Sequence, residues 1–226
     1  VILWFGSWVF GIVRKVQKGL SVFGVFSIIS HLFTISIIIT MGCFIRVIYA
    51  YYEAFGKDSE TVSKFISSAI RGFQTNGMVA CAKHFPGHGF VVGDTHKKLV
   101  YIDGEMKEVK NYSPMIGHGV ASIMVAHLAI KNNLEFDTED MPSTCSRKIV
   151  TDLLKDSLQF KGLVITDAMN MGGVVNVDQC GLKAAQAGCD QLLMPVDEKQ
   201  VLFDILTQMR IDDTFKKEVN ESVKKI

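Results

Sequence analysis

The segment at residues 83–96 gathers residue types that can transfer protons and bind a polar ligand. It reads Lys-His-Phe-Pro-Gly-His-Gly over 83–89 and Asp-Thr-His over 94–96, and it holds three of the six histidines in the 226-residue chain. Asp94 lies two residues before His96, so its carboxylate can hydrogen-bond one imidazole nitrogen and leave the other for proton transfer. Lys83 and His84 add hydrogen-bond donors for substrate hydroxyls. We therefore expect a functional loop with acid/base chemistry.

Two other interpretations of this loop remain open. One is a metal site, whose ligands would be His84, His88, Asp94 and His96. The Pro-Gly pair at 86–87 keeps the histidines off a helix, and their spacing matches no strong metal motif. The other is ordinary surface polarity beside Lys97 and Lys98.

A second candidate is Asp167, which ends the apolar run Gly-Leu-Val-Ile-Thr at 162–166. A carboxylate at the mouth of a buried strand can be partly desolvated and directed at a ligand, as a nucleophile or base requires. It could equally be the cap of a following helix. Position alone does not separate the two roles.

The elements that must position these residues alternate between helical and strand patterns after Phe55. A helix is predicted from residues 58–60 to the Asn-Gly stop at 76–77, and Ser146 is a candidate cap for another helix. Further helices are expected to end near Gly119 and to cover 182–187 and the region of 201–206. Short apolar strands are expected at 78–82, 121–126, 162–166 and 189–194.

Strands without polar alternation, each preceded by a helix, favour parallel βα units. In such units the carboxyl ends of all strands share one rim, where barrel and open α/β enzymes place their sites. His84, His127 and Asp167 fall at three of these ends. We predict an α/β fold of the (β/α)8 TIM-type barrel, with its second half recognisable and its first half replaced or incomplete.

Residues 1–52 differ from the rest because they contain no Asp or Glu. Within them, residues 19–45 form a run of 27 residues without Asp, Glu, Lys or Arg. A membrane-spanning helix needs about 20 apolar residues, so this run is a possible transmembrane helix and a means of membrane association. A signal-anchor, a buried core segment and sequence with no role in the protein are the alternatives. We place the boundary of the second domain at 53–226.

The composition limits the function classes. The net charge is +1 and the bases are not clustered, which argues against a nucleic-acid partner. Five scattered cysteines without a C-x-x-C pair favour free thiols over a disulfide framework or a zinc site.

The ordered motifs resemble glycoside hydrolase family 3, and more narrowly its bacterial β-N-acetylglucosaminidase (β-hexosaminidase) branch. The family pattern begins with Lys-His-Phe-Pro-Gly-His-Gly and continues through Asp-Ser-His to Leu, with the spacing seen between residues 83 and 99. The further matching segments are Ile-Met-Val-Ala-His at 123–127, Pro-Ser-Thr at 142–144, Gly-Leu-Val-Ile-Thr-Asp-Ala-Met at 162–169, Ala-Gly-Cys-Asp at 187–190 and Leu-Leu-Met-Pro at 192–195.

This resemblance implies a hydrolase that cleaves β-linked N-acetylglucosamine with retention, through a covalent glycosyl-enzyme. By position, Asp167 would be the nucleophile, and His96, oriented by Asp94, would be the general acid and then the general base. The residues placed at the substrate would be Lys83, His84, His127 and Met171. The resemblance implies an amino-sugar glycan as partner and no metal or organic cofactor. It fits a bacterial protein of the cytoplasm or periplasm, or one associated with the membrane through 19–45.

Three departures from the family pattern leave alternatives open. Phe90 and Val91 stand where the family has Asp-Thr, and Glu53 stands where an Arg that holds substrate is usual. Residues 1–50 do not resemble the first half of the family's barrel. The alternatives are an inactive or glycan-binding remnant of the family, and a metal-dependent hydrolase that uses the histidine cluster.

Overall fold

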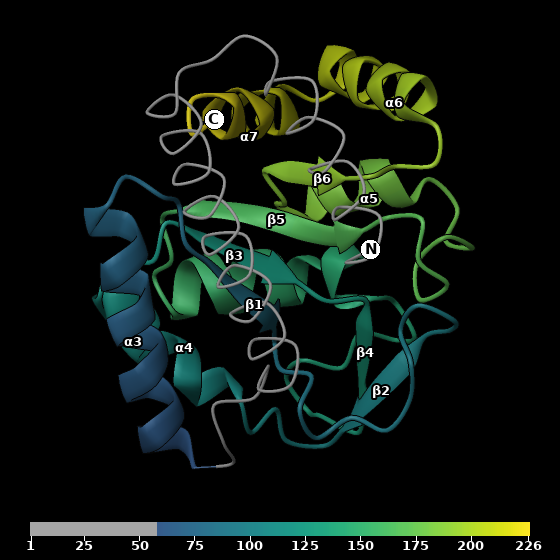
Figure 1. Cartoon of the computed structure of the whole chain (residues 1–226). Coiled ribbons are helices and arrows are strands. Elements are labelled where there is room, and N and C mark those ends of the chain that lie inside the picture. Colours follow the sequence, from purple (N-terminus) through teal and green to yellow (C-terminus); the bar gives the residue numbers. More distant parts are fainter. Residues whose placement is uncertain (1–57) are drawn as a thin grey trace, which may run out of the picture. The chain divides into compact units, whose positions relative to one another are not determined.

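The computed structural model describes residues 58–226, and these form a layered α/β arrangement built on a parallel sheet (Figure 1). The sheet has four strands in the order β1-β3-β5-β6, and all neighbours are parallel. Its strands are β1 (Cys81–Phe85), β3 (Ser122–Val125), β5 (Leu163–Ala168) and β6 (Gln191–Leu193). The order of these four strands in the sheet is the same as their order along the chain, as in successive βα units. The predicted α/β class is confirmed, and within the described residues the sheet is open.

A second, two-stranded parallel sheet pairs segments that directly follow the loop and β3. Its strands are β2 (Val100–Asp103) and β4 (Leu128–Lys131), with Val100 opposite Leu128. The sequence patterns did not predict it.

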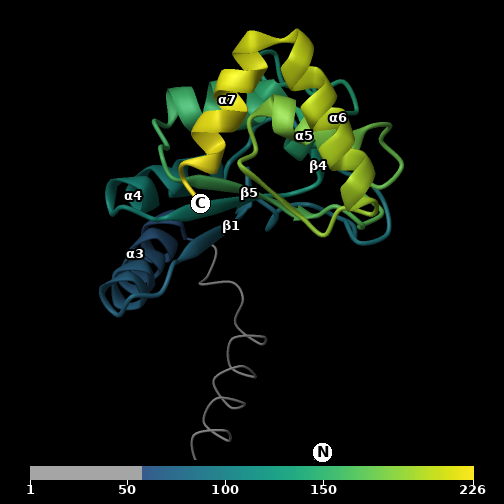
Figure 2. The same cartoon turned by 90° about the horizontal axis from the view of Figure 1, so that it is seen from above.

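The helices are gathered mainly on one side of the sheet: Figure 2 shows α5, α6 and α7 together there, with α3 near the β1 edge. The helices are α3 (Ser59–Thr75), α4 (Tyr112–Gly117), α5 (Cys180–Ala187), α6 (Glu198–Ile211), α7 (Asp213–Val223), the 3-10 turns η1 (Val109–Asn111) and η2 (Ser143–Cys145), and the π-helix η3 (Lys148–Ser157). The core lies between these helices and the sheet, and it includes the fully buried Phe85, Ile123, Leu154 and Val164.

Local signals place helix α3 where the sequence predicted it. The Asp58 side chain accepts a hydrogen bond from the Thr61 amide at 2.7 Å and caps the start of the helix. Asn76 is the C-cap, and Gly77 follows it with φ at 76°, a conformation that glycine adopts without strain.

The first strand was predicted three residues too early. Met78 and Val79 are exposed, Val79 at 75%, and β1 begins at Cys81, where the ladder to Ser122 starts. Ala82 and Phe85 are buried, while Lys83 between them is exposed. The register with β3 shifts between Ala82 and Phe85, so burial does not alternate regularly along this strand. Lys83 and His84 lie within β1 and not beyond it.

Two other expectations needed correction. Ser146 does not cap η3 with its side chain: its carbonyl oxygen accepts from the Ile149 and Val150 amides, and the helix begins at Lys148. Strand β5 extends to Ala168, so Asp167 lies inside the strand and not beyond it.

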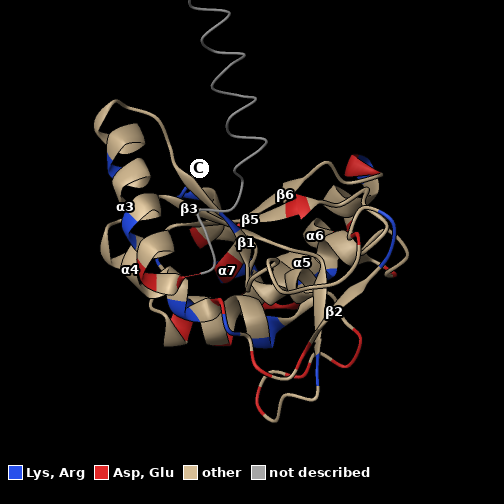
Figure 3. Cartoon of the chain, turned by 60° about the horizontal axis from the view of Figure 1, so that its bottom comes forward, with Lys and Arg blue, Asp and Glu red and all other residues tan. Residues whose placement is uncertain are grey.

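Charged residues of both signs are interspersed over the helices and loops, while the strands of the main sheet are mostly uncharged (Figure 3). The helices between residues 58 and 226 are all too short or too polar to span a bilayer. The predicted span at 19–45 and the predicted boundary at 52 lie outside the described residues. The four cysteines in the described part are free thiols.

A buried ion cluster around Asp190 joins α7 to the sheet. The Asp190 side chain is 1% exposed and accepts hydrogen bonds from the Val164 amide at 2.8 Å and Ser222 Oγ at 2.7 Å. Lys225 Nζ lies at 2.9 Å and Lys155 Nζ at 3.3 Å. Burial alone would raise the pKa of Asp190, but the Val164 amide and the Lys155 charge outweigh it and hold the pKa below its usual value.

We expect Asp190→Ala to lower the free energy of unfolding by about 3 kcal/mol at pH 7, because it leaves two partly buried lysines without their carboxylate. Since the folded pKa is lowered, the carboxylate stabilises the fold above its unfolded pKa of about 4, and this contribution is lost as the pH falls through the folded pKa. Urea unfolding at pH 7 and pH 3 measures both effects. Asp156→Ala, which removes an exposed acid on η3, is the control, and equal midpoints for the two variants would contradict the prediction.

Candidate active site

The carboxyl-terminal rim of the main sheet brings His84 and Asp167 together. His84 comes from β1 and Asp167 from β5, and β3 lies between them. His84 Nε2 is 3.8 Å from Asp167 Oδ2, which is ion-pair distance when the ring is protonated. Asp167 Oδ1 accepts a hydrogen bond from the Ala168 amide at 2.8 Å. Both side chains are partly buried, so the carboxylate is held by the strand end and remains reachable from the rim.

His127 lies beneath this rim and is fully buried. Its Nε2 is 3.0 Å from the Ala168 carbonyl oxygen and its Nδ1 is 2.9 Å from Thr144 Oγ1. Burial lowers the pKa of His127, so the ring is neutral, with Nε2–H donating to Ala168 and Nδ1 accepting from Thr144. Both ring nitrogens are thus used within the protein, Nε2 at the end of β5 and Nδ1 at η2. This geometry gives no support to the predicted contact of His127 with a sugar.

The Asp94–His96 pair predicted from the sequence is formed on the loop. Asp94 Oδ1 lies 2.9 Å from His96 Nδ1 and also accepts from the His96 amide at 3.0 Å, while Lys97 Nζ lies 3.6 Å from Oδ2. The His96 amide, the ring contact and the Lys97 charge together hold the pKa of Asp94 below its usual value. The His96 side chain is 78% exposed. With Nδ1 on Asp94, Nε2 is the nitrogen that can meet a substrate.

Two backbone hydrogen bonds attach this loop to the segment that follows Asp167. The Gly172 amide donates to the His96 carbonyl at 2.9 Å, and the Gly173 amide donates to the Thr95 carbonyl at 3.0 Å. His88 adds a contact within the loop, with Nε2 3.3 Å from Thr95 Oγ1. The Asp94–His96 pair is therefore positioned relative to the strand that carries Asp167.

Sequence reasoning missed these two glycines. A Cβ on Gly172 would lie 2.3 Å from the Lys97 carbonyl oxygen, and one on Gly173 would lie 3.1 Å from the Thr95 carbonyl oxygen. Close backbone approach is a known reason for glycine. The Gly-Gly pair soon after Asp167 was the signal that could have found the contact.

The other predicted substrate residues differ in exposure. Lys83 of β1 is exposed. Met171 is buried, in the turn after β5 where its amide donates to the Ala168 carbonyl at 3.0 Å. Its side chain is mostly withdrawn from solvent.

We expect Gly172→Ala to speed hydrogen exchange of the amides at residues 95–98 about tenfold or more, because its Cβ would lie 2.3 Å from the Lys97 carbonyl oxygen and the loop would have to shift. Amide hydrogen exchange followed by mass spectrometry measures this. Gly117→Ala is the matched control, since its Cβ would meet nothing within 4 Å. Equal exchange rates in the two variants would contradict the role of the Gly172 contact.

No group of three His, Cys, Asp or Glu side chains suited to a metal ion is found between residues 58 and 226. The metal site considered for His84, His88, Asp94 and His96 therefore gains no support from the geometry.

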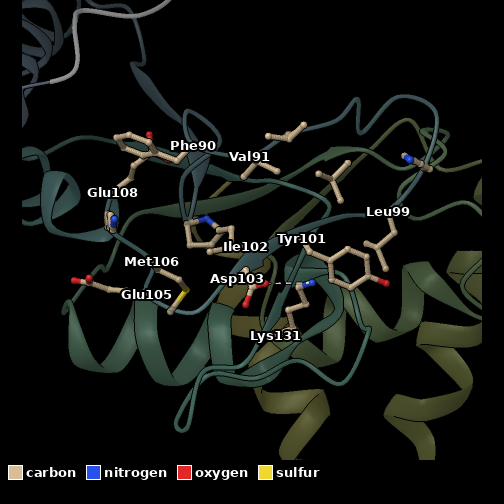
Figure 4. Close-up of a pocket in the computed structure, with 15 residues that line it drawn as sticks. Phe90, Val91, Leu99, Tyr101, Ile102, Asp103, Glu105, Met106, Glu108 and Lys131 are labelled. Atoms are coloured by element: carbon tan, nitrogen blue, oxygen red, sulfur yellow. Dashed lines mark ion pairs between the residues drawn. The ribbon is translucent and has the colours of Figure 1, made fainter.

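A cavity of about 620 Å³ lies beside the loop (Figure 4). Phe90 and Val91 of the loop form one wall, and Tyr101 and Ile102 of β2 form another. Lys131 of β4 pairs with Asp103 of the neighbouring strand β2 at 3.3 Å, and both line the cavity. Asp167 is not among the residues that line it.

Comparison with known proteins decides the family. A model of the glycosyl hydrolase family 3 N-terminal domain matches residues 50–226. The chain belongs to glycosyl hydrolase family 3. The predicted resemblance is thereby confirmed, and so is the TIM-type barrel fold, of which the described residues form an open part.

Curated family 3 relatives named beta-hexosaminidase match the chain over about 150 residues. The protein of Nitrosospira multiformis is 30% identical over 150 residues, which are 63% of this chain and 42% of that protein. The protein of Nitrosomonas eutropha is 33% identical over 153 residues, with the same shares covered. The aligned part of the chain therefore spans less than half the length of these relatives.

Solved family 3 structures share the fold. The beta-N-acetylhexosaminidase of Beutenbergia cavernae superposes with a TM-score of 0.68 at 27% identity, over 75% of this chain and 52% of that one. The beta-N-acetylglucosaminidase of Paenibacillus sp. gives 0.67 at 27% identity, over 75% and 34%.

Proposed function

We propose that the chain is a retaining glycoside hydrolase that cleaves β-linked N-acetylglucosamine from amino-sugar glycans. The observation that carries the proposal is the attachment of the Asp94–His96 pair, through Gly172 and Gly173, to the segment that follows Asp167. This arrangement supplies a carboxylate at the strand end and an imidazole acid on a loop tied to the same strand. The names of the relatives support the amino sugar as substrate.

In the first step, an Asp167 carboxylate oxygen attacks the anomeric carbon as the glycosidic bond breaks. His96 Nε2 gives its proton to the departing oxygen, so the leaving group departs as an alcohol. The Asp94 carboxylate stabilises the imidazolium before transfer and fixes the ring through Nδ1. In the second step His96 accepts a proton from water, which attacks the anomeric carbon and releases Asp167.

The remaining site residues have supporting roles in this proposal. Lys83 and His84 donate to sugar hydroxyls from β1, and the contact of His84 with Asp167 orients the carboxylate. His127 acts from below by holding the Ala168 carbonyl, and Met171 lies in the wall beneath the sugar.

A second candidate function is a glycan-binding remnant without turnover. It is favoured by one observation, that Phe90 and Val91 stand where the family pattern has Asp-Thr. It predicts sugar binding at the rim without cleavage.

A covalent label separates the two candidates. We expect a fluorinated N-acetylglucosaminyl inactivator to add one sugar to the chain, and peptide mass spectrometry should find the sugar on Asp167, because a slow second step lets the glycosyl-enzyme accumulate. Prior incubation with free N-acetylglucosamine should slow the labelling. Binding of the sugar without an adduct would support the remnant, and an adduct at another carboxylate would contradict the assignment of Asp167.

A further inference from the structure

The loop that carries the acid/base pair is also held at its beginning, by a side chain that the mechanism above does not use. Glu108 lies just before η1, and its Oε2 accepts a hydrogen bond from the Gly89 amide at 2.9 Å. It also lines the cavity beside the loop, on the same side as Phe90 (Figure 4). Segments nearly twenty residues apart in the chain thus meet through one carboxylate.

The two glycines of the Gly-His-Gly sequence leave room for this carboxylate. A Cβ on Gly87 would lie 2.6 Å from Glu108 Oε2, and a Cβ on Gly89 would lie 2.7 Å from Glu108 Oε1. Gly87 has φ at 141°, which favours glycine by itself, but no such conformation is found at Gly89. The missing side chain at Gly89 is therefore accounted for by the Glu108 contact.

These contacts complete a two-point attachment of the loop. Glu108 holds the beginning at Gly89, and the Gly172 and Gly173 amides hold the end at Thr95 and His96. Asp94 and His96 lie at the far end of the segment between these points. A hydrogen bond that involves a charged group is stronger than a neutral one, so the carboxylate is well suited to fix the loop.

We propose that Glu108 is a positioning residue for the acid/base pair, acting on the loop through the Gly89 amide. The inference rests on the proposed function, because it assigns Glu108 to the step in which His96 donates its proton. Glu108 itself does not touch the reacting atoms.

The test compares two aryl N-acetylglucosaminides with the full 226-residue chain. Dinitrophenolate departs without protonation, whereas a plain phenolate needs the acid, and kcat/KM reports the first chemical step for both. We expect Glu108→Ala to lower kcat/KM about tenfold or more for the phenyl substrate, and by less than about threefold for the dinitrophenyl substrate. An equal loss on both substrates, or no loss on either, would overturn the proposal.

Two further variants separate positioning from a general structural effect. Glu108→Gln keeps an oxygen acceptor for the Gly89 amide and should recover phenyl activity to within about threefold of the parent chain. Glu105→Ala removes an exposed acid of the same segment and should change neither substrate. Failure of the glutamine variant to recover more activity than the alanine variant would count against the acceptor role.

A double-mutant cycle tests the contact between the two segments. Gly89→Ala places its Cβ against the Glu108 carboxylate and should displace it, so this variant should lose about as much phenyl activity as Glu108→Ala. Because both changes break the same contact, the double variant should lose no more than either single variant. Losses that multiply would show two independent effects and overturn the proposal.

Amide hydrogen exchange keeps the inference separate from the proposed function. We expect Glu108→Ala to speed exchange of the Gly89 amide about tenfold or more, and Glu105→Ala to leave it unchanged. If the parent chain cleaves neither substrate, the proposed function fails, while faster exchange would still support the Glu108 contact. Unchanged exchange in Glu108→Ala would overturn it in either case.

Discussion

Replacing Asp167 with Asn should lower kcat/KM for an aryl N-acetylglucosaminide by at least about 10⁴-fold, the order of loss expected when a nucleophile is removed. The amide is nearly the same size as the carboxylate, and it can still accept from the Ala168 amide. It cannot supply the negative oxygen that forms the bond to the anomeric carbon. The fold should be kept, with a thermal unfolding midpoint close to that of the parent chain.

A smaller residue at this position also predicts what a small anion should do. In Asp167→Ala, azide can occupy the space left by the carboxylate and attack the anomeric carbon in its place, so azide should restore part of the release from an activated aryl substrate. Asp178→Asn, at an exposed acid in the segment after β5, should keep full activity and serves as the control. If Asp167→Asn retained more than about a tenth of the parent activity, Asp167 would not be the nucleophile.

The sequence predicts best where the signal is local. The start and end of α3 follow from Asp58 as a cap and from Asn76-Gly77, which act within a few residues of the helix ends. The signal for the Asp94–His96 pair is equally local, because the two residues are two positions apart and meet within a turn of the loop. Asp167 was placed at the rim because an apolar run led directly to it.

The sequence fails where distant parts of the chain decide the structure. Met78 and Val79 are apolar but exposed, because the ladder with β3 begins only at Cys81. Strands β2 and β4 stabilise each other across a long sequence separation, and each is only four residues long. Such pairings leave no periodic pattern that a window along the chain could detect.

The same reasoning explains why the residues that support the site were missed. Gly172 and Glu108 act through contacts with the loop's backbone, so their role is visible only once the loop and the rim are folded together. The sequence predicts His127 at a strand end, but its burial and its hydrogen bond to Thr144 of η2 involve a residue 17 positions away, which no local pattern indicates.

Replacing His96 with Ala should lower kcat/KM for a phenyl N-acetylglucosaminide by about 10²-fold to 10⁴-fold, the range that general acid catalysis contributes. Release of dinitrophenol in the first step should change little, because that leaving group needs no proton. Hydrolysis of the glycosyl-enzyme should then be slow, since the base for water is gone. We therefore expect a progress curve with a burst of dinitrophenol equal to the enzyme concentration, followed by slow turnover.

The partner of the imidazole gives an independent readout of the same step. Asp94→Asn should also lower kcat/KM for the phenyl substrate and leave first-step release of dinitrophenol nearly unchanged, because the amide no longer stabilises the imidazolium. His118→Ala, at an exposed histidine after α4, is the matched control and should keep full activity on both substrates. Full activity of His96→Ala on the phenyl substrate would assign the proton to another group on the rim, and His84, beside Asp167 at 3.8 Å, would be the first to examine.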